Sequence, residues 1–303
     1  MIAERRPLDA RAVALMVALC GMWGFQQVAM KAAAPFMAPV LQVALRSFLA
    51  LLIILPIFIA KRPMRRALAV HWRGGVLVGA LFAAQFFCVA QGLHYTSASH
   101  MVMFFYTAPI FSALGLHFAF PEEKIAPLQW GGIALAFLGV LLAFSGNGAG
   151  GERLAEAWKG DLLGLIAGAL WGASTVTIRS TSLTTASASV SLFFHLLGAS
   201  VLLFPVAVLR GDTHVTPASA LFVSLAYQVL FMSVAGFFTW LALLKVYLAS
   251  RLSILSFMTP VFGVAAAVLL LDEKIDIFFI AGSLLVIGGI VLVSARDVLT
   301  KMS

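Results

Sequence analysis

The sequence predicts an all-α integral membrane protein with ten transmembrane helices, arranged as two inverted five-helix repeats around a central cavity. The first observation is composition: 62% of residues are hydrophobic, 11% are charged, and the mean hydropathy is +1.04. A soluble domain carries about 25% charged residues. The second is length, because 303 residues accommodate ten apolar stretches of about 20 residues with their loops. The third is an internal repeat.

The repeat is read from two pairs of segments. LCGMWGFQQVAMK at 19–31 returns as AGALWGASTVTIR at 167–179, a step of 148 residues, and PEEK at 121–124 returns as LDEK at 271–274, a step of 150. A step that changes so little along the chain indicates two copies of one structural unit, which differ by small insertions in their loops.

The two copies define the expected organisation. A first repeat occupies residues 1–146, an interhalf loop 147–159, and a second repeat 160–303. The expected spans are 12–33, 38–60, 74–93, 98–119, 127–146, 160–179, 187–209, 219–244, 251–271 and 276–295. The first apolar run resembles a signal peptide. Because its counterpart lies in the middle of the chain, we expect it to be a retained helix.

Five spans in each half is an odd number, so two copies of one fold must lie in the membrane with opposite orientations. With the N-terminus inside, the inner segments carry fourteen Lys and Arg residues and the outer segments five. This bias predicts that both termini are cytoplasmic.

Charge and cysteine content exclude several functions. The net charge of +8 comes from basic residues in short loops, where they orient the helices and contact anionic lipid, so we expect no nucleic-acid partner. Cys20 and Cys88 both lie in apolar runs and give no disulfide or metal-ligand pattern. No nucleophile–base set, zinc spacing or phosphate loop is present. We expect no enzyme activity, cofactor or metal.

All twelve carboxylates fall in loops, tails or helix ends. A carrier that exchanges a proton for a cation at a carboxylate in mid-membrane therefore has no candidate residue here. The sequence favours neutral, zwitterionic or anionic cargo, without an obligatory carboxylate proton relay.

Polar and aromatic side chains at membrane depth are the candidate substrate-binding residues. Gln26-Gln27 and Ser174-Thr175 occupy equivalent places beside the repeated tryptophans, as two half-sites facing one cavity would. For each polar residue taken singly, an interhelix hydrogen bond is the alternative, because hydrocarbon penalises unpaired polar groups. The candidates are Trp23, Gln26, Gln27, Arg46, Gln85, Tyr106, Trp171, Ser174, His195, Gln228 and Trp240.

Arg46 is the one permanent charge well inside an expected span, and its partner position in the second half is His195. Two interpretations of Arg46 stay open. In one, it caps helix carbonyls and extends outward to the membrane surface; in the other, its guanidinium binds a substrate carboxylate. For His195 the alternatives are a neutral ring bonded to a backbone carbonyl and a proton relay.

The duplicated order of these features resembles the drug/metabolite transporter superfamily, and within it the ten-helix EamA-type carriers. The resemblance covers essentially the whole chain. The features that carry it are the steps Trp23-Gly24 and Trp171-Gly172, the segment Arg46-Ser47-Phe48, the prolines Pro109 and Pro260, the acidic turns Glu122-Glu123 and Asp272-Glu273, and the glycine pairs Gly132 and Gly139, and Gly282 and Gly289.

The resemblance implies a bacterial inner-membrane carrier that exports small metabolites by alternating access through a central cavity. Within the superfamily, the chain is similar to exporters of neutral and aromatic amino acids. Exporters of drugs, nucleosides or sugars, and a channel or scaffold subunit, are the alternatives. His195 in place of a second arginine argues against any mechanism that needs a symmetric arginine pair. The sequence does not predict the oligomeric state.

Overall fold

The structure is a computed structural model that describes residues 9–60, 62–121, 123–145, 156–247, 252, 255–256 and 258–299. This described part consists of helices joined by turns and short loops, and it contains an isolated β-bridge between Met37 and Val215. The all-α prediction is confirmed. Residues 147–155 of the expected interhalf loop, and residues 251, 253, 254 and 257 of the span expected at 251–271, lie outside the described residues.

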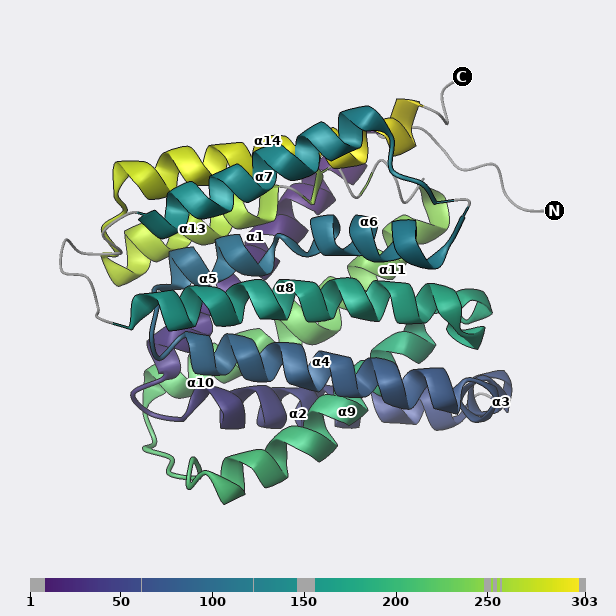
Figure 1. Ribbon diagram of the computed structural model, residues 1–303. Coiled ribbons are helices and arrows are strands. Elements are labelled where there is room, and N and C mark those ends of the chain that lie inside the picture. Colours follow the sequence, from purple (N-terminus) through teal and green to yellow (C-terminus); the bar gives the residue numbers. More distant parts are fainter. Residues whose placement is uncertain are drawn as a thin grey trace.

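The helices follow the expected spans closely (Figure 1). In the first half they are α1 (Ala10–Ala33), α2 (Pro39–Ala60), α3 (Arg62–Val70), α4 (Trp72–Gly92), α5 (Ala98–Phe105), α6 (Ala108–Ala119) and α7 (Pro127–Ser145). In the second half they are α8 (Ala157–Ser180), η1 (Ser182–Thr185), α9 (Ala188–Leu209), α10 (Ser219–Ala226), η2 (Tyr227–Ala235), α11 (Gly236–Val246), α13 (Met258–Leu271) and α14 (Ile277–Leu299).

Within the described residues, eight helical segments are long and apolar enough to cross a membrane. They match the first eight expected spans. Two shorter apolar helices, Met258–Leu271 and Ile277–Val293, coincide with the remaining two. Helix α3 was not expected. Its basic face carries Arg62, Arg65 and Arg66, while Met64 and Leu68 pack against the apolar side chains of neighbouring helices, which is why this loop segment forms an amphipathic helix.

Two spans are interrupted in the middle. The fourth breaks between α5 and α6, where Pro109 lies in the first turn of α6 and lacks the N–H that would continue the ladder from α5. The eighth passes through the π-helix η2, where Ser233 Oγ donates to the carbonyl of Gln228 at 2.9 Å. Wider turns of this kind often occur at functional sites.

The helices form one bundle in which α7 lies alongside α14 (Figure 1). Glycines allow this close approach. A Cβ at Gly139 would lie 2.5 Å from the carbonyl oxygen of Gly282, and one at Gly289 would lie 2.4 Å from that of Gly132. Such contacts exclude a side chain and bring the two backbones together, as is common between membrane helices.

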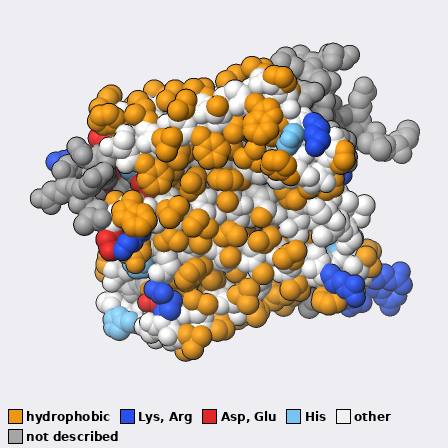
Figure 2. Space-filling model, in the orientation of Figure 1, with side chains coloured by type: hydrophobic (Ala, Val, Ile, Leu, Met, Phe, Trp, Pro, Cys, Tyr) orange, Lys and Arg blue, Asp and Glu red, His pale blue; other side chains and the backbone are white. Residues whose placement is uncertain are grey.

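The bundle has two ends, which we name by residues. At the Lys31 end, α1 ends and α5 and α8 begin; at the Arg179 end, α8 ends and α9 begins (Figure 1). Between the ends, hydrophobic side chains cover the visible face, and charged side chains gather toward the ends (Figure 2). Leu141, Leu269 and Leu284 are each at least 66% exposed. A soluble monomer rarely carries so extensive an apolar surface, and this one fits lipid.

Candidate functional site

A cavity of about 490 Å³ lies between the two halves of the bundle. Its wall combines aromatic and aliphatic side chains with polar groups, and none of the described residues that line it is Asp, Glu, Lys or Arg. The aromatic lining residues are Trp23, Phe82, Phe86, Phe105, Tyr106, Trp171, Phe237 and Trp240, and the polar ones are Gln26, Gln85, Ser174, Thr175, Ser191, His195 and Ser256.

Helical spacing places these groups on the wall. Trp23 and Gln26 are three residues apart on α1, and Trp171, Ser174 and Ile178 follow the same spacing on α8. Residues three and four apart share one face of a helix, so each helix presents a strip to the cavity. Ile178 and Ala188 extend the lining toward the Arg179 end.

Aromatic rings meet on two sides of the cavity. The rings of Trp23 and Trp240 are 5.8 Å apart and edge-on, and Trp171 lies 4.9 Å from Phe105 and 5.6 Å from Tyr106. These distances are typical of favourable aromatic pairs. The paired tryptophans of the repeat therefore stand on α1 and α8 with separate aromatic partners.

The structure places eight of the eleven candidate residues on the cavity wall and three behind it. On the wall are Trp23, Gln26, Gln85, Tyr106, Trp171, Ser174, His195 and Trp240. The residues outside the lining are Gln27, Arg46 and Gln228, which are 1%, 1% and 0% exposed.

Arg46 lies behind the cavity wall. Its side chain is buried instead of reaching the end of the helix, and the guanidinium carbon lies 4.5 Å from the centre of the Phe86 ring. With the Gln26 carboxamide oriented to satisfy its neighbours, Gln26 Oε1 accepts hydrogen bonds from Arg46 Nη1 at 2.9 Å and Nη2 at 3.3 Å. Arg46 therefore contacts the back of a cavity-lining residue.

His195, at the equivalent position of the second half, behaves differently. It lines the cavity, and its ring centre lies 4.7 Å from that of Phe82, one turn of α4 from Phe86. The two equivalent positions thus approach the same face of α4, with one side chain in the wall and the other behind it.

Gln228 has the interhelix role that the sequence left open. Its Nε2 donates to Gln42 Oε1 and to Ser224 Oγ, each at 3.1 Å. Gln42 Nε2 in turn donates to the carbonyls of Met30 at 3.1 Å and Met37 at 2.8 Å. This network joins α1, α2 and η2 and lies outside the cavity. Gln27 is also buried, and its carboxamide has no hydrogen bond within the described part of the chain.

The sequence analysis missed several lining residues. Phe82 and Phe86 lie three residues before and one after Gln85, and Ser191 lies one turn before His195. Helical spacing could have identified Phe82 from Gln85, Ser191 from His195 and Phe237 from Trp240, and Phe86 lies one turn beyond Phe82. Ser256 had no such signal, because it precedes α13.

Comparisons with known proteins agree with this architecture. Residues 10–145 and 158–295 match the EamA-like transporter family. The chain is 28% identical over 287 residues, 92% of each sequence, to a protein of Salmonella typhimurium named probable amino-acid metabolite efflux pump, and equally so to its namesake in Escherichia coli K12. An uncharacterized transporter of Archaeoglobus fulgidus is 26% identical over 72% of each chain.

The fold has a counterpart among solved structures. One crystal structure superposes with a TM-score of 0.66 at 16% sequence identity, covering 95% of this chain and 99% of the other. At this level of identity the likeness concerns the fold alone.

Proposed function

Because the chain belongs to the EamA-like transporter family, we propose that it exports neutral amino acids, aromatic ones included, by alternating access through the central cavity. The family match spans both halves and confirms the resemblance seen in the sequence. The chain is therefore a multi-pass membrane transporter. Two relatives that are named probable amino-acid metabolite efflux pumps support the proposed direction and cargo.

The observation that carries the choice of cargo is the cavity wall. A volume of about 490 Å³ is within the range of small-molecule sites. Aromatic walls favour an apolar or aromatic side chain through contact area and ring packing. No described lining residue carries a permanent charge, so a lipophilic cation would find no carboxylate to neutralise it. The wall suits a molecule that is neutral overall and has a few polar groups.

The contact between Arg46 and Gln26 supports recognition of a carboxylate. Because Arg46 donates to the carboxamide oxygen of Gln26, and Gln26 lines the cavity, we infer that its NH₂ group faces the cavity. An NH₂ group only donates hydrogen bonds. We infer that this NH₂ group donates a hydrogen bond to the substrate carboxylate. The buried guanidinium of Arg46 polarises the carboxamide and makes its NH₂ group a stronger donor. In this arrangement Arg46 is a positioning residue.

We also propose ten spans in two inverted repeats, 1–146 and 160–303, in a bacterial inner membrane with both termini cytoplasmic. The described helices support this, because the beginning of α1 and the end of α14 lie at the same end of the bundle (Figure 1). In this orientation the Lys31 end faces outward. Reporter fusions test the topology: a C-terminal fusion active only in the periplasm would contradict it.

Counterflow in proteoliposomes tests the carrier mechanism. Unlabelled phenylalanine or leucine inside the vesicles should accelerate entry of the labelled amino acid, because a carrier reorients faster when loaded. A channel gives no such acceleration. Nucleosides, sugars and a lipophilic cation serve as competing cargo. Trans-stimulation by one of these, with none by amino acids, would reject the proposed substrate class.

A second experiment tests Gln26. For Gln26→Leu we expect about a tenfold higher KM for phenylalanine, equivalent to about 1.4 kcal/mol, with little change for its methyl ester. Arg46→Lys should behave similarly but more weakly, because an ammonium cannot hold the carboxamide with a planar pair of donors. Gln228→Leu is the matched control, since Gln228 lies outside the cavity: it should lower the melting temperature and leave the ratio of amino acid to ester unchanged.

A further inference from the structure

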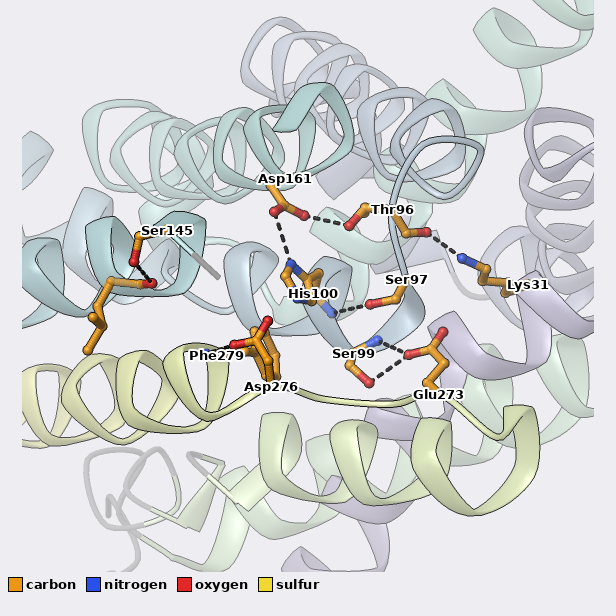
Figure 3. Close-up of polar contacts among 11 residues, drawn as sticks. Lys31, Thr96, Ser97, Ser99, His100, Ser145, Asp161, Glu273, Asp276 and Phe279 are labelled. Carbon is orange, nitrogen blue, oxygen red and sulfur yellow. Dashed lines mark hydrogen bonds and ion pairs between the residues drawn. The ribbon is translucent and has the colours of Figure 1, made fainter. Parts of the chain in front are cut away.

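Asp161 is a buried carboxylate at the Lys31 end of the bundle. It lies near the beginning of α8 and is 3% exposed. The hydroxyl of Thr96 donates to its Oδ1 at 2.5 Å, and His100 Nδ1 lies 2.9 Å from its Oδ2 (Figure 3). A carboxylate without water is stable only when such partners satisfy it. These bonds attach the beginning of α8 in the second half to the beginning of α5 in the first.

Glu273 makes a second connection between the halves. Its Oε1 accepts from the backbone N–H of Ala98 at 2.7 Å, and its Oε2 accepts from the N–H and hydroxyl of Ser99 at 3.0 and 2.7 Å (Figure 3). The first N–H groups of a helix have no partner within it, and a negative charge is favourable there. Here the charge comes from the turn between α13 and α14.

Lys31 adds a contact from α1, since its ammonium donates to the carbonyl of Thr96 (Figure 3). The beginning of α5 is thus held by α1, by α8 and by the turn before α14. None of these polar groups lines the cavity. Asp161 precedes Trp171, which does line it, by about 15 Å of helix. Met30, Met101, Phe105 and Ala167 belong to one buried apolar cluster in this part of the bundle.

We propose that Thr96, Ser99, His100, Asp161 and Glu273 form a latch that closes the Lys31 end of the cavity, and that the latch opens when the carrier exposes its cavity to that side. The inference rests on the proposed function, because alternating access requires each end to close and open in turn. Polar contacts can break at low cost when the bundle opens, because water forms hydrogen bonds with the separated groups. A close backbone packing contact, such as that of Gly139 with Gly282, gains no such hydrogen bonds from water when it separates.

A thiol reporter on the cavity wall tests the latch. Cys20 and Cys88 are first replaced by alanine, and Thr175→Cys then supplies the single thiol, at a lining position on α8. A membrane-impermeant reagent is applied from each face. A parallel sample carries Thr213→Cys in the exposed segment after α9. The face from which this thiol is labelled is the membrane face at the Lys31 end. The unaltered latch should make labelling from that face slow.

Asp161→Asn and Glu273→Gln should each accelerate labelling from the Lys31 face at least fivefold. Glu123→Gln is the matched control, because Glu123 holds the equivalent place in the first repeat and lies at the Arg179 end. It should change that rate less than twofold. Where Asp161→Asn does not fold, Thr96→Val and Ser99→Ala each remove a single latch contact and give the same comparison.

Unchanged labelling from the Lys31 face in all folded latch variants would overturn the proposal. So would equal acceleration by Glu123→Gln. The labelling needs no substrate, so its result is separate from counterflow. Accelerated labelling without counterflow retains the latch and rejects the carrier function, while counterflow with unchanged labelling retains the carrier and rejects the latch.

Discussion

The two ends of the bundle carry equivalent sequence features in different surroundings. Lys31 and Arg179 end the first helix of each half, and Glu273 and Glu123 occupy the same place in the two acidic turns. At the Lys31 end, Glu273 bonds to the beginning of α5. At the Arg179 end, Glu123 Oε1 lies 3.3 Å from Arg179 Nε, and the two side chains are 35% and 46% exposed.

Residues at equivalent places in the two repeats therefore do not make equivalent contacts. The cavity lining extends to Ile178 and Ala188, near the exposed pair, and does not reach the residues that we propose as a latch. An ion pair in water is worth about 0–1 kcal/mol. Leaving a buried polar group without its partner costs about 1–3 kcal/mol, and more for a charged group. The Lys31 end is thus expected to be held much more strongly, and three experiments compare the two ends.

The largest difference is expected between Asp161→Leu and Glu123→Leu. The first leaves the Thr96 hydroxyl and the His100 ring buried without their acceptor, so we expect a loss of about 2–5 kcal/mol of folding stability. The second removes an exposed pair and should cost about 1 kcal/mol or less. Thermal unfolding of purified protein in detergent measures both. Similar shifts in melting temperature would show that contacts at the two ends contribute equally to folding stability.

A smaller difference is expected between Lys31→Met and Arg179→Met. Lys31 donates to the Thr96 carbonyl from a half-buried position, and hydrogen bonds to charged groups are worth about 1.5–3 kcal/mol. Arg179 is exposed, so its replacement should cost about 1 kcal/mol or less. Methionine keeps an unbranched apolar chain at both positions and removes the charged group. A larger loss of folding stability for Arg179→Met than for Lys31→Met would contradict the expectation that contacts at the Lys31 end are the stronger ones.

The smallest effect concerns pH at the Lys31 end. Burial lowers the pKa of His94 below its ordinary value of 6.5, and nearby Arg210 and Lys31 lower it further while Asp212 opposes them. The folded state therefore favours the neutral ring. This contribution to stability is complete above about pH 6.5 and is lost as the pH falls through the folded pKa.

Melting temperatures at pH 7.5 and pH 5 should thus differ less in His94→Gln than in the unaltered protein. The ring remains partly exposed, so a difference of a few degrees at most is expected. If the melting temperature depended on pH identically in both proteins, His94 would not contribute to the pH dependence of stability.

Local patterns in the sequence were enough to predict the all-α membrane architecture and much of the cavity wall. Hydropathy and helical spacing are local properties, so eight expected spans appear as helices of sufficient length. Trp23 and Gln26 on α1, and Trp171 and Ser174 on α8, each share a face whatever the rest of the chain does. The repeat in the sequence likewise predicted that both tryptophans would line the same space.

The contacts of the charged residues depend on how distant parts of the chain pack together, so the sequence could not predict them. Asp161 and Glu273 stand at helix ends, as the sequence indicated, but that position does not fix their exposure. Asp161 is buried because residues 61 and 65 positions away in the chain pack over it, and Glu273 bonds to a helix 174 and 175 positions away. Arg46 lies behind Gln26 for the same reason. Its partners come from three other helices, whose arrangement no local pattern specifies.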